Sequence, residues 1–412
     1  MKFAGIIAEY DPFHNGHAWQ LAQARALGAQ RVAVAMSCGL TQRGALPLLP
    51  ESVRVRAALE CGADLVFALP APWACAGAEA FARAGVHLLA ATGCDALVFG
   101  AETPDAALLL ETARVLNSAA YRAALKQQLA AGARSFAAAR QAAVQAVGAD
   151  PAMAALLSQP NNNLAVEYCR AILEQRAGMT PVPLPRRGAN HGQTLEESGH
   201  AQFASASALR ALWAEGGAEA VAPFVPEKAF ELYKTAENDG AYTDFDAAGR
   251  CELTLLRAAC VKPEPFAAVR GVSEGLEHRL EHAVRQSTSL PQLLDALTTV
   301  RYPRARMRRL AMDAALGYTA DTVPALPPAL HLLGARKDAL PLLGQVSLPV
   351  SHSLAKLAQT GPNGARMAAA QAAAQPSTWT PTASSSSAPT AARSMCSPAR
   401  SPCAASTVPS ET

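Results

Sequence analysis

The first hundred residues alternate short apolar segments with longer segments of helical character, and this alternation constrains the fold more than any other feature. The expected strands are Lys2–Ala8, Arg31–Met36, Asp64–Leu69 and Ala96–Phe99. The helices expected between them are Gly16–Leu27, Glu51–Cys61 and Ala74–Ala90. Short apolar strands separated by helices are typical of βαβ units. The sequence therefore predicts an α/β fold built on a buried, doubly wound parallel sheet.

The rest of the chain divides into three further parts by composition. Residues 105–158 are rich in Ala and Leu and predict a helical insertion within an α/β domain that spans residues 1–220. The segments "QPNNNLAVEY" (159–168) and "TPVPLPRR" (180–187) fit a return to the sheet. Residues 225–358 predict a second, helical domain.

The last residues have a different character. Residues 365–412 become rich in Ser, Thr, Pro and Ala and contain no Leu, Ile, Phe or Tyr. Such a segment buries too little apolar surface to offset its ordering entropy. The composition predicts a disordered, low-complexity tail, and a frameshift after about Ala374 is one hypothesis for its origin.

Composition narrows the class of protein. Half of the residues are hydrophobic, which allows a sizeable core, and 412 residues are enough for two domains. The net charge of +3 is too small to indicate a polyanionic partner by itself. Nine scattered cysteines without a CxxC pair argue against a disulfide framework or a zinc site, so we expect reduced thiols, a cytoplasmic location and no metal bound by the protein.

The first apolar stretch is short and is interrupted by Glu9 and Asp11. This pattern is typical of a buried strand and not of a signal peptide. No apolar run reaches membrane-spanning length, so we expect no membrane association, and nothing in the sequence indicates a protein partner.

The loop after the first expected strand carries the sharpest chemical signal. The stretch "EYDPFHNGHAWQL" places His14 and His17 on either side of Gly16, where a strand gives way to a helix. Ligands of open parallel sheets bind beyond the carboxyl ends of the strands, and a helix N-terminus suits a phosphate. Two imidazoles there can donate hydrogen bonds to phosphate oxygens and stabilise charge that develops when a phosphoryl bond breaks. Two surface histidines near a turn are the plainer alternative, which this placement disfavours.

The motif resembles a known signature. "HNGH" after "GIIAEYDPF" is similar to the HxGH signature of the nucleotidyltransferase superfamily, and the whole run resembles the tRNA(Met) cytidine acetate ligase family. The resemblance extends from Met1 to about Ala358 and implies a Rossmann-like nucleotide-binding domain followed by a helical one. Further blocks occur in the family's order: "SCGLTQRG" (Ser37–Gly44), "GADLVFALPAPWACAGAEAFA" (Gly62–Ala82), "LVFGAE" (Leu97–Glu102), "QPNNNLAVEY" (Gln159–Tyr168) and "SASALR" (Ser205–Arg210).

The resemblance implies catalytic roles for His14 and His17 at the α-phosphate of ATP. It also implies an ATP-binding set drawn from several blocks, in which Arg186 is favoured over Arg187. That set comprises Ile7, Ala8, Glu9, Tyr10, Asp11, Pro12, Phe13, His14, Asn15, Gly16, His17, Gly100, Asn161, Asn162, Arg186, Ser205, Ser207 and Arg210.

Several members of this set have a structural alternative. Ser205 can cap a helix, with Arg210 solvated beyond it, and at least one of Asn161 and Asn162 can form a turn or a helix cap. Asp11 stands where the family usually has Asn, and "SCGLTQRG" departs from the usual "SGNFVQRG". Within that loop, Arg43 is a candidate contact for the nucleotide or for RNA.

Five arginines fall between Arg301 and Arg309 in "RYPRARMRRL". A cluster of this kind serves phosphate contacts, although a solvated helix face explains it equally well. The resemblance favours tRNA binding, with Arg301, Arg304 and Arg308 as candidate contacts.

The resemblance implies a two-step ligase that uses ATP as substrate. Acetate forms acetyl-adenylate, and the wobble cytidine of elongator tRNA(Met) is then acetylated to N4-acetylcytidine. Mg²⁺ is expected as the charge partner of the triphosphate, although no acidic cluster marks its ligands. The alternatives are a nucleotidyltransferase acting on a small phosphorylated metabolite and a non-catalytic tRNA- or nucleotide-binding protein.

Overall fold

A seven-stranded sheet forms the centre of the molecule. The computed structural model describes residues 1–186 and 203–375, and the strands run in the order β5-β4-β1-β2-β3-β6-β7. Strands β1 to β5 are parallel, whereas β6 is antiparallel to β3. The strands are β1 (Phe3–Ala8), β2 (Arg31–Ser37), β3 (Leu65–Leu69), β4 (Ala96–Ala101), β5 (Thr180–Pro185), β6 (Leu330–Ala335) and β7 (Val350–Ser351).

The order of the first five strands confirms the predicted α/β, doubly wound class. Strand order reverses between β1 and β4, so the loops that follow these two strands open on the same crevice at the carboxyl edge. This topological switch point is where such sheets bind ligands.

Side chains alternate between two apolar cores along each strand. In β2, Ala33 and Ala35 face one core, while Val34 and Met36 face the other. One face is covered by α4 (Ala78–Ala91), α5 (Ala106–Asn117) and α9 (Pro160–Gln175). The opposite face is covered by α1 (Asn15–Ala26), α2 (Glu51–Glu60), α10 (Ala206–Val221) and α11 (Glu227–Asn238).

The return to the sheet is shorter than the sequence suggested. Residues 180–185 form the edge strand β5, whose prolines suit an edge position. The expectation of sheet for residues 159–168 is wrong, because this segment begins helix α9. Pro160 occupies its first turn, and Ala165, Cys169 and Ile172 recur on its buried face at helical spacing.

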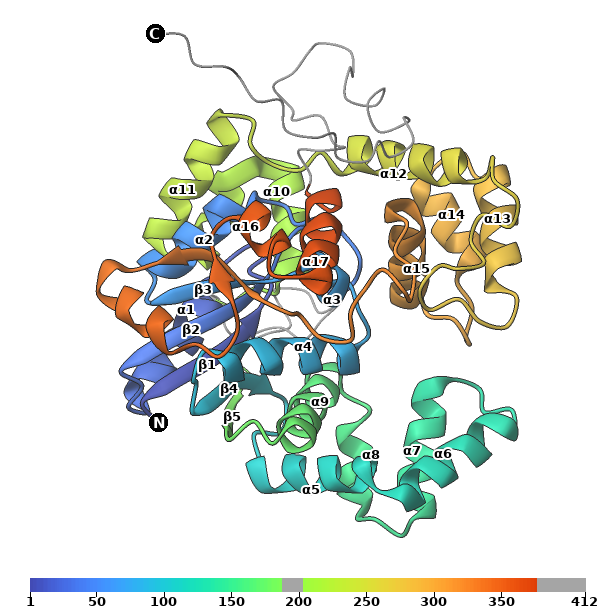
Figure 1. Cartoon of the computed structure of the whole chain (residues 1–412), viewed down its shortest axis with the longest axis horizontal. Helices are drawn as coiled ribbons and strands as arrows, with labels where there is room; N and C mark the ends of the chain where they lie inside the picture. Colours follow the sequence, from blue (N-terminus) through green and yellow to red (C-terminus); the bar gives the residue numbers. More distant parts are fainter. Residues whose placement is uncertain (187–202, 376–412) are drawn as a thin grey trace, which may run out of the picture.

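Two groups of helices extend from the sheet domain (Figure 1). The expected insertion, residues 105–158, contains α5 with α6 (Ala119–Ala130), α7 (Phe136–Ala146) and α8 (Pro151–Leu156). The second group has its own apolar core, which includes Leu253, Leu280, Leu293 and Leu310. It comprises α12 (Phe245–Ala259), α13 (Leu276–Gln286), α14 (Leu290–Leu297) and α15 (Arg304–Leu316).

The second domain is therefore smaller than the predicted 225–358. Helix α11 packs on the sheet domain, and β6 and β7 extend the sheet beyond β3. The apolar run of β6 pairs with an otherwise open strand edge, which the Leu- and Ala-rich pattern did not reveal. The remaining elements are α3 (Ala71–Ala74), α16 (Leu354–Ala358), α17 (Pro362–Ala373), and the short 3₁₀ segments η2 (Ala222–Phe224) and η3 (Lys337–Gln345).

The tail prediction is wrong for its first residues, because residues 365–373 belong to helix α17. Met367, Ala368 and Gln371 form a buried face at helical spacing. Gln371 accepts a hydrogen bond from the backbone N–H of Ala71 (2.6 Å) and donates to Cys38 Sγ (2.9 Å). Residues 376–412, the rest of the predicted tail, lie outside the described residues. Within the described part of the chain, none of the helices has the length and apolar character that crossing a membrane requires.

Candidate active site

The loop between β1 and α1 presents the two histidines. His14 is the N-cap of α1, and its Nδ1 accepts a hydrogen bond from the backbone N–H of Gly16 (3.1 Å). His17 Nδ1 accepts one from the backbone N–H of His14 (3.3 Å). Both histidines thus satisfy free N–H groups at the start of the helix, as a reciprocal capping box does.

This arrangement fixes the proton positions on both rings. A neutral imidazole whose Nδ1 accepts a hydrogen bond carries its proton on Nε2. The two rings stack with centroids 3.7 Å apart and an interplanar angle of 24°. Together they form a pair of oriented Nε2–H donors at the switch point of the sheet.

Both rings are held in the neutral state. Burial, together with the nearby Arg186 guanidinium, lowers the pKa of His14 to about 3. Burial, His14 and Arg186 place the pKa of His17 well below its ordinary value. Both rings are therefore neutral near neutral pH, and Arg186 supplies a positive charge beside them.

Gly16 permits this close stacking. A Cβ atom at this position would lie 2.9 Å from His14 Cε1, which is closer than real contacts allow. Glycine is thus required between the two histidines of the motif.

Side chains distant in sequence fix the loop. Arg54, only 1% exposed, donates to the carbonyls of Glu9 (2.8 Å) and Ser37 (2.9 Å), which follow β1 and end β2. The buried Tyr233 hydroxyl donates to the carbonyl of Phe13 (2.7 Å). Sequence reasoning missed both residues, because a single Arg or Tyr within a helical pattern carries no local signal.

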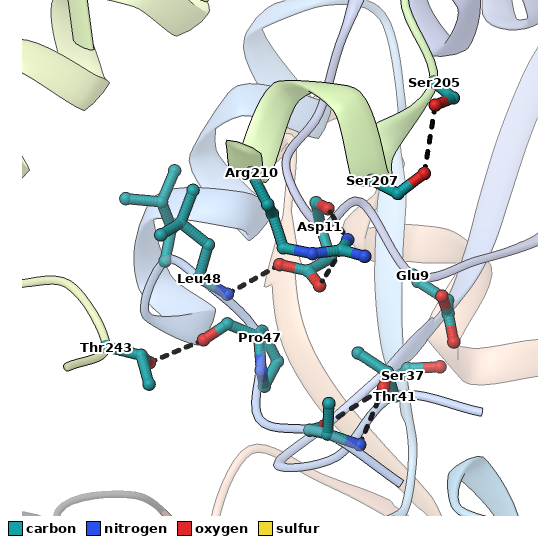
Figure 2. Close-up of polar contacts among 12 residues, drawn as sticks. Glu9, Asp11, Ser37, Thr41, Pro47, Leu48, Ser205, Ser207, Arg210 and Thr243 are labelled. Carbon is teal, nitrogen blue, oxygen red and sulfur yellow. Dashed lines mark hydrogen bonds and ion pairs between the residues drawn. The ribbon is translucent and has the colours of Figure 1, made fainter. Parts of the chain in front are cut away.

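Helix α10 brings the serine-rich block to the same loop (Figure 2). Ser205 caps the helix through its Oγ, which accepts from the backbone N–H of Ala208 (3.3 Å) and lies 3.1 Å from Ser207 Oγ. Arg210 donates to the Asp11 carbonyl (2.8 Å) and to Asp11 Oδ2 (3.1 Å). Asp11 Oδ1 also accepts from the backbone N–H of Leu48 (2.6 Å). The buried Asp11 thus holds Arg210 beside the loop.

The loop after β4 follows the strand that neighbours β1 in the sheet. Gly100 is exposed at the end of β4, and a Cβ placed there would lie 3.4 Å from Arg186 Cγ. Glu102 accepts from the backbone N–H of Asn161 (3.1 Å) and of Asn162 (2.6 Å) at the start of α9. The structure brings Gly100, Arg186 and the histidine pair together.

The two asparagines have structural contacts of their own. Asn161 Nδ2 donates to Glu102 (2.6 Å), and the buried Asn162 accepts from the backbone N–H of Thr103 (2.9 Å). Asn162 thus joins the start of α9 to the loop after β4, although the N-cap residue Gln159 does not cap that helix with its side chain, and ATP binding by either asparagine stays a prediction. Glu102, although quoted within "FGAE", was not predicted to act there.

Glu9 and Gln42 join the site to the rest of the molecule. Glu9 Oε1 accepts from the backbone N–H of Gln42 (2.5 Å), and burial raises the pKa of this carboxyl. Gln42 Nε2 donates to the carbonyl of Ala76 (2.8 Å), and the carbonyl of Gln42 accepts from Arg309 (3.4 Å). The "QRG" segment thus lies between the candidate site and α15. For Arg43, binding to the nucleotide or to RNA stays a prediction.

The candidate tRNA-binding arginines each form an ion pair. Arg301 pairs with Glu274 (2.7 Å), Arg304 with Asp295 and Arg308 with Glu252. The Arg304 pair is exposed, whereas the Glu252 carboxylate is buried.

Within residues 1–186 and 203–375, no group of three or more His, Cys, Asp or Glu side chains is arranged to hold a metal ion.

Comparison with known proteins identifies the family to which the chain belongs. The model of the HIGH Nucleotidyl Transferase family matches residues 1–385. Proteins named tRNA(Met) cytidine acetate ligase are similar over most of their length. The Syntrophotalea carbinolica protein is 33% identical (87% of this chain, 86% of that protein), and a Listeria monocytogenes protein is 30% identical (86% and 90%). The chain belongs to the tRNA(Met) cytidine acetate ligase family of these nucleotidyl transferases.

A solved structure agrees with this assignment. The crystal structure of Thermotoga maritima TmcAL bound with alpha-thio ATP is 27% identical, covers 92% of this chain and 93% of that one, and superposes with a TM-score of 0.80. The described part of the chain therefore shares its fold with a protein whose crystal structure contains a bound ATP analogue.

Proposed function

We propose that this chain is an ATP-dependent ligase that acetylates the wobble cytidine of elongator tRNA(Met), forming N4-acetylcytidine. In the first step an acetate oxygen attacks the α-phosphorus of ATP, which gives acetyl-adenylate and releases pyrophosphate. In the second step the exocyclic amine of the cytidine attacks the acetyl carbonyl and AMP leaves. We place this reaction in the cytoplasm.

One observation supports the first step above all others: the stacked His14–His17 pair at the switch point of the sheet. We expect the Nε2–H groups of the two rings to stabilise the charge that develops on the α-phosphate oxygens. Because the rings are neutral, they can donate without carrying a charge that would hold pyrophosphate in the site.

Arg186 and Arg210 supply charge for the other phosphates. Arg186 lies close enough to lower the pKa of both histidines, and Ser205 and Ser207 place hydroxyls beside Arg210. Guanidinium groups suit phosphate because they remain charged and donate in a fork. Mg²⁺ would enter with the triphosphate, bound by phosphate oxygens and water, because that ion keeps much of its hydration shell.

The acetylation of tRNA tests this proposal. The chain is incubated with ATP, labelled acetate and an elongator tRNA(Met) transcript, and the digested nucleosides are analysed. We expect N4-acetylcytidine and AMP in equal amounts, and no product from a matched transcript whose wobble cytidine is replaced by uridine. Pyrophosphate release that depends on a phosphorylated metabolite instead of acetate would support the metabolite nucleotidyltransferase. ATP binding without turnover would support the non-catalytic alternative.

A further inference from the structure

A cavity of about 210 Å³ lies between the sheet domain and the helices α12–α15. The connection between α3 and α4, Cys75–Gly77, lines one side of this interdomain cavity. Arg270, Arg306, Arg309 and Asp313 line the other. Three guanidinium groups thus share this cavity with one carboxylate.

The carboxylate is already engaged by one of the three arginines. Arg270 forms a two-point contact with Asp313, at 3.0 Å (Nε to Oδ2) and 2.7 Å (Nη2 to Oδ1). Arg270 also donates to the carbonyl of Cys75 (3.0 Å). This residue therefore fixes the wall of the cavity and has little capacity for a ligand.

Arg306 and Arg309 have weaker contacts. Arg306 lies 3.4 Å from Ser273 Oγ and 5.0 Å from the centroid of the Tyr302 ring, and Arg309 donates to the Gln42 carbonyl at 3.4 Å. Among the described residues, no carboxylate lies within 4.0 Å of either guanidinium. Burial lowers the pKa of Arg309; Cys75 and Asp313 act to raise it, and the like charges of Arg306 and Arg270 make smaller lowering contributions. An anion in the cavity would relieve this repulsion.

Gly44 lies in the loop after β2 and lets that loop pack closely against α15, the helix that carries Arg306 and Arg309. Gly44 adopts a φ of +84°, and a Cβ there would lie 3.0 Å from the backbone nitrogen of Arg309. Gln42 also bonds Glu9 through its N–H and Arg309 through its carbonyl. The interdomain cavity is thus separate from the histidine pair. The loop after β2 connects the two, because Gln42 contacts both Glu9 and Arg309.

We infer that the interdomain cavity binds a phosphate group through Arg306 and Arg309, and that its occupant is a backbone phosphodiester of the RNA substrate. This inference rests on the proposed function. An RNA backbone is favoured over a free anion because the site continues onto Tyr302 and Arg301 at the start of the same arginine-rich segment. Arginine forks and an adjacent aromatic ring are common contacts for RNA.

Binding of an elongator tRNA(Met) transcript at a series of salt concentrations tests the inference. Arg306→Gln should weaken tRNA binding roughly tenfold and reduce the log–log salt slope by about one unit. Arg306→Lys should retain most of the slope, because it retains the charge. Arg285→Gln is the matched control. It removes an exposed arginine of the same helical domain that is paired within its own helix with Glu281.

Modification by phenylglyoxal distinguishes the two sources of phosphate. The tRNA should protect Arg306 from modification, whereas inorganic phosphate at the same phosphate concentration should not. Protection by inorganic phosphate alone would overturn the assignment to RNA. Unchanged affinity and slope in Arg306→Gln would overturn the site itself.

Pyrophosphate exchange distinguishes failure of the cavity assignment from failure of the proposed function. Acetate-dependent exchange should be normal in Arg306→Gln, because ATP is bound at the other site. If the wild-type chain acetylates tRNA and Arg306→Gln binds it normally, only the cavity assignment fails. If the wild type neither exchanges pyrophosphate nor acetylates tRNA, the proposed function fails with it.

Discussion

The histidine pair (His14 and His17) and the arginine segment (Arg301–Arg309) differ in where their hydrogen-bond and ion-pair partners lie in the sequence. His14 and His17 take their hydrogen bonds from backbone groups within three residues of themselves. Arg304, Arg301 and Arg308 pair with carboxylates 9, 27 and 56 residues away. A short motif therefore supplies the hydrogen-bond partners of both rings, whereas the arginines are paired with carboxylates from distant parts of the chain. The first region is thus easier to interpret from sequence.

The largest effect is expected from the histidine pair. His14→Ala and His17→Ala should each lower the rate of acetyl-adenylate formation by roughly a hundredfold or more, because each removes a positioned donor. The rate of acetate-dependent pyrophosphate exchange measures this. Circular dichroism and the melting temperature control for folding, and near-normal exchange in both folded variants would contradict the assignment.

Within the arginine segment, the buried Arg308–Glu252 pair should contribute more to stability than the exposed Arg304–Asp295 pair. Arg308→Gln should lower the free energy of unfolding by about 3–5 kcal/mol, because it leaves the Glu252 carboxylate, only 1% exposed, without its partner. Arg304→Gln should cost about 1 kcal/mol or less, because Asp295 is 70% exposed. Urea unfolding of both variants gives the two values.

A matched double variant isolates the buried pair. Adding Glu252→Gln to Arg308→Gln should recover part of the loss, since no unpaired charge then remains. Equal losses for Arg308→Gln and Arg304→Gln would show that burial does not distinguish the two pairs.

The contact between helix α17 and Ala71 should contribute less to stability than the buried Arg308–Glu252 pair. Gln371→Ala should lower the free energy of unfolding by about 1–3 kcal/mol, because the N–H of Ala71 loses its acceptor. Thermal or urea unfolding measures this, with Arg366→Ala on the same helix as an exposed control. A loss no greater than that of the control would show that the end of the chain does not depend on this contact.

A further prediction concerns the pH dependence of stability. The pKa of His14 in the folded chain is about 3, below the ordinary value of 6.5. Between these values the unfolded chain binds the proton more readily, so the free energy of unfolding falls as pH decreases through this window. His14→Gln should make that fall shallower. A slope equal to that of the wild type between pH 6.5 and 4 would contradict a neutral His14.

The difference between local and long-range contacts explains how much of the fold and of the candidate site could be predicted from the sequence. The parallel sheet and the histidine loop follow from local patterns, and β1, β2, β3 and β4 were placed within a residue or two. Strand β6 was missed because its partner β3 lies far away in sequence. Arg54 and Tyr233 were missed for the same reason, since each acts on a carbonyl brought near only by folding. The ion pairs of the arginine segment also depend on partners that no local motif contains.

Acetate-dependent exchange of labelled pyrophosphate into ATP, measured without tRNA, tests the central claim most directly. We expect the histidine pair, with Arg186 and Arg210, to carry out the first step without tRNA. We predict that the wild-type chain exchanges pyrophosphate when acetate is present, that His14→Ala does not, and that Arg304→Gln does so at the wild-type rate. Exchange that is independent of acetate, or that survives intact in His14→Ala, would contradict the account.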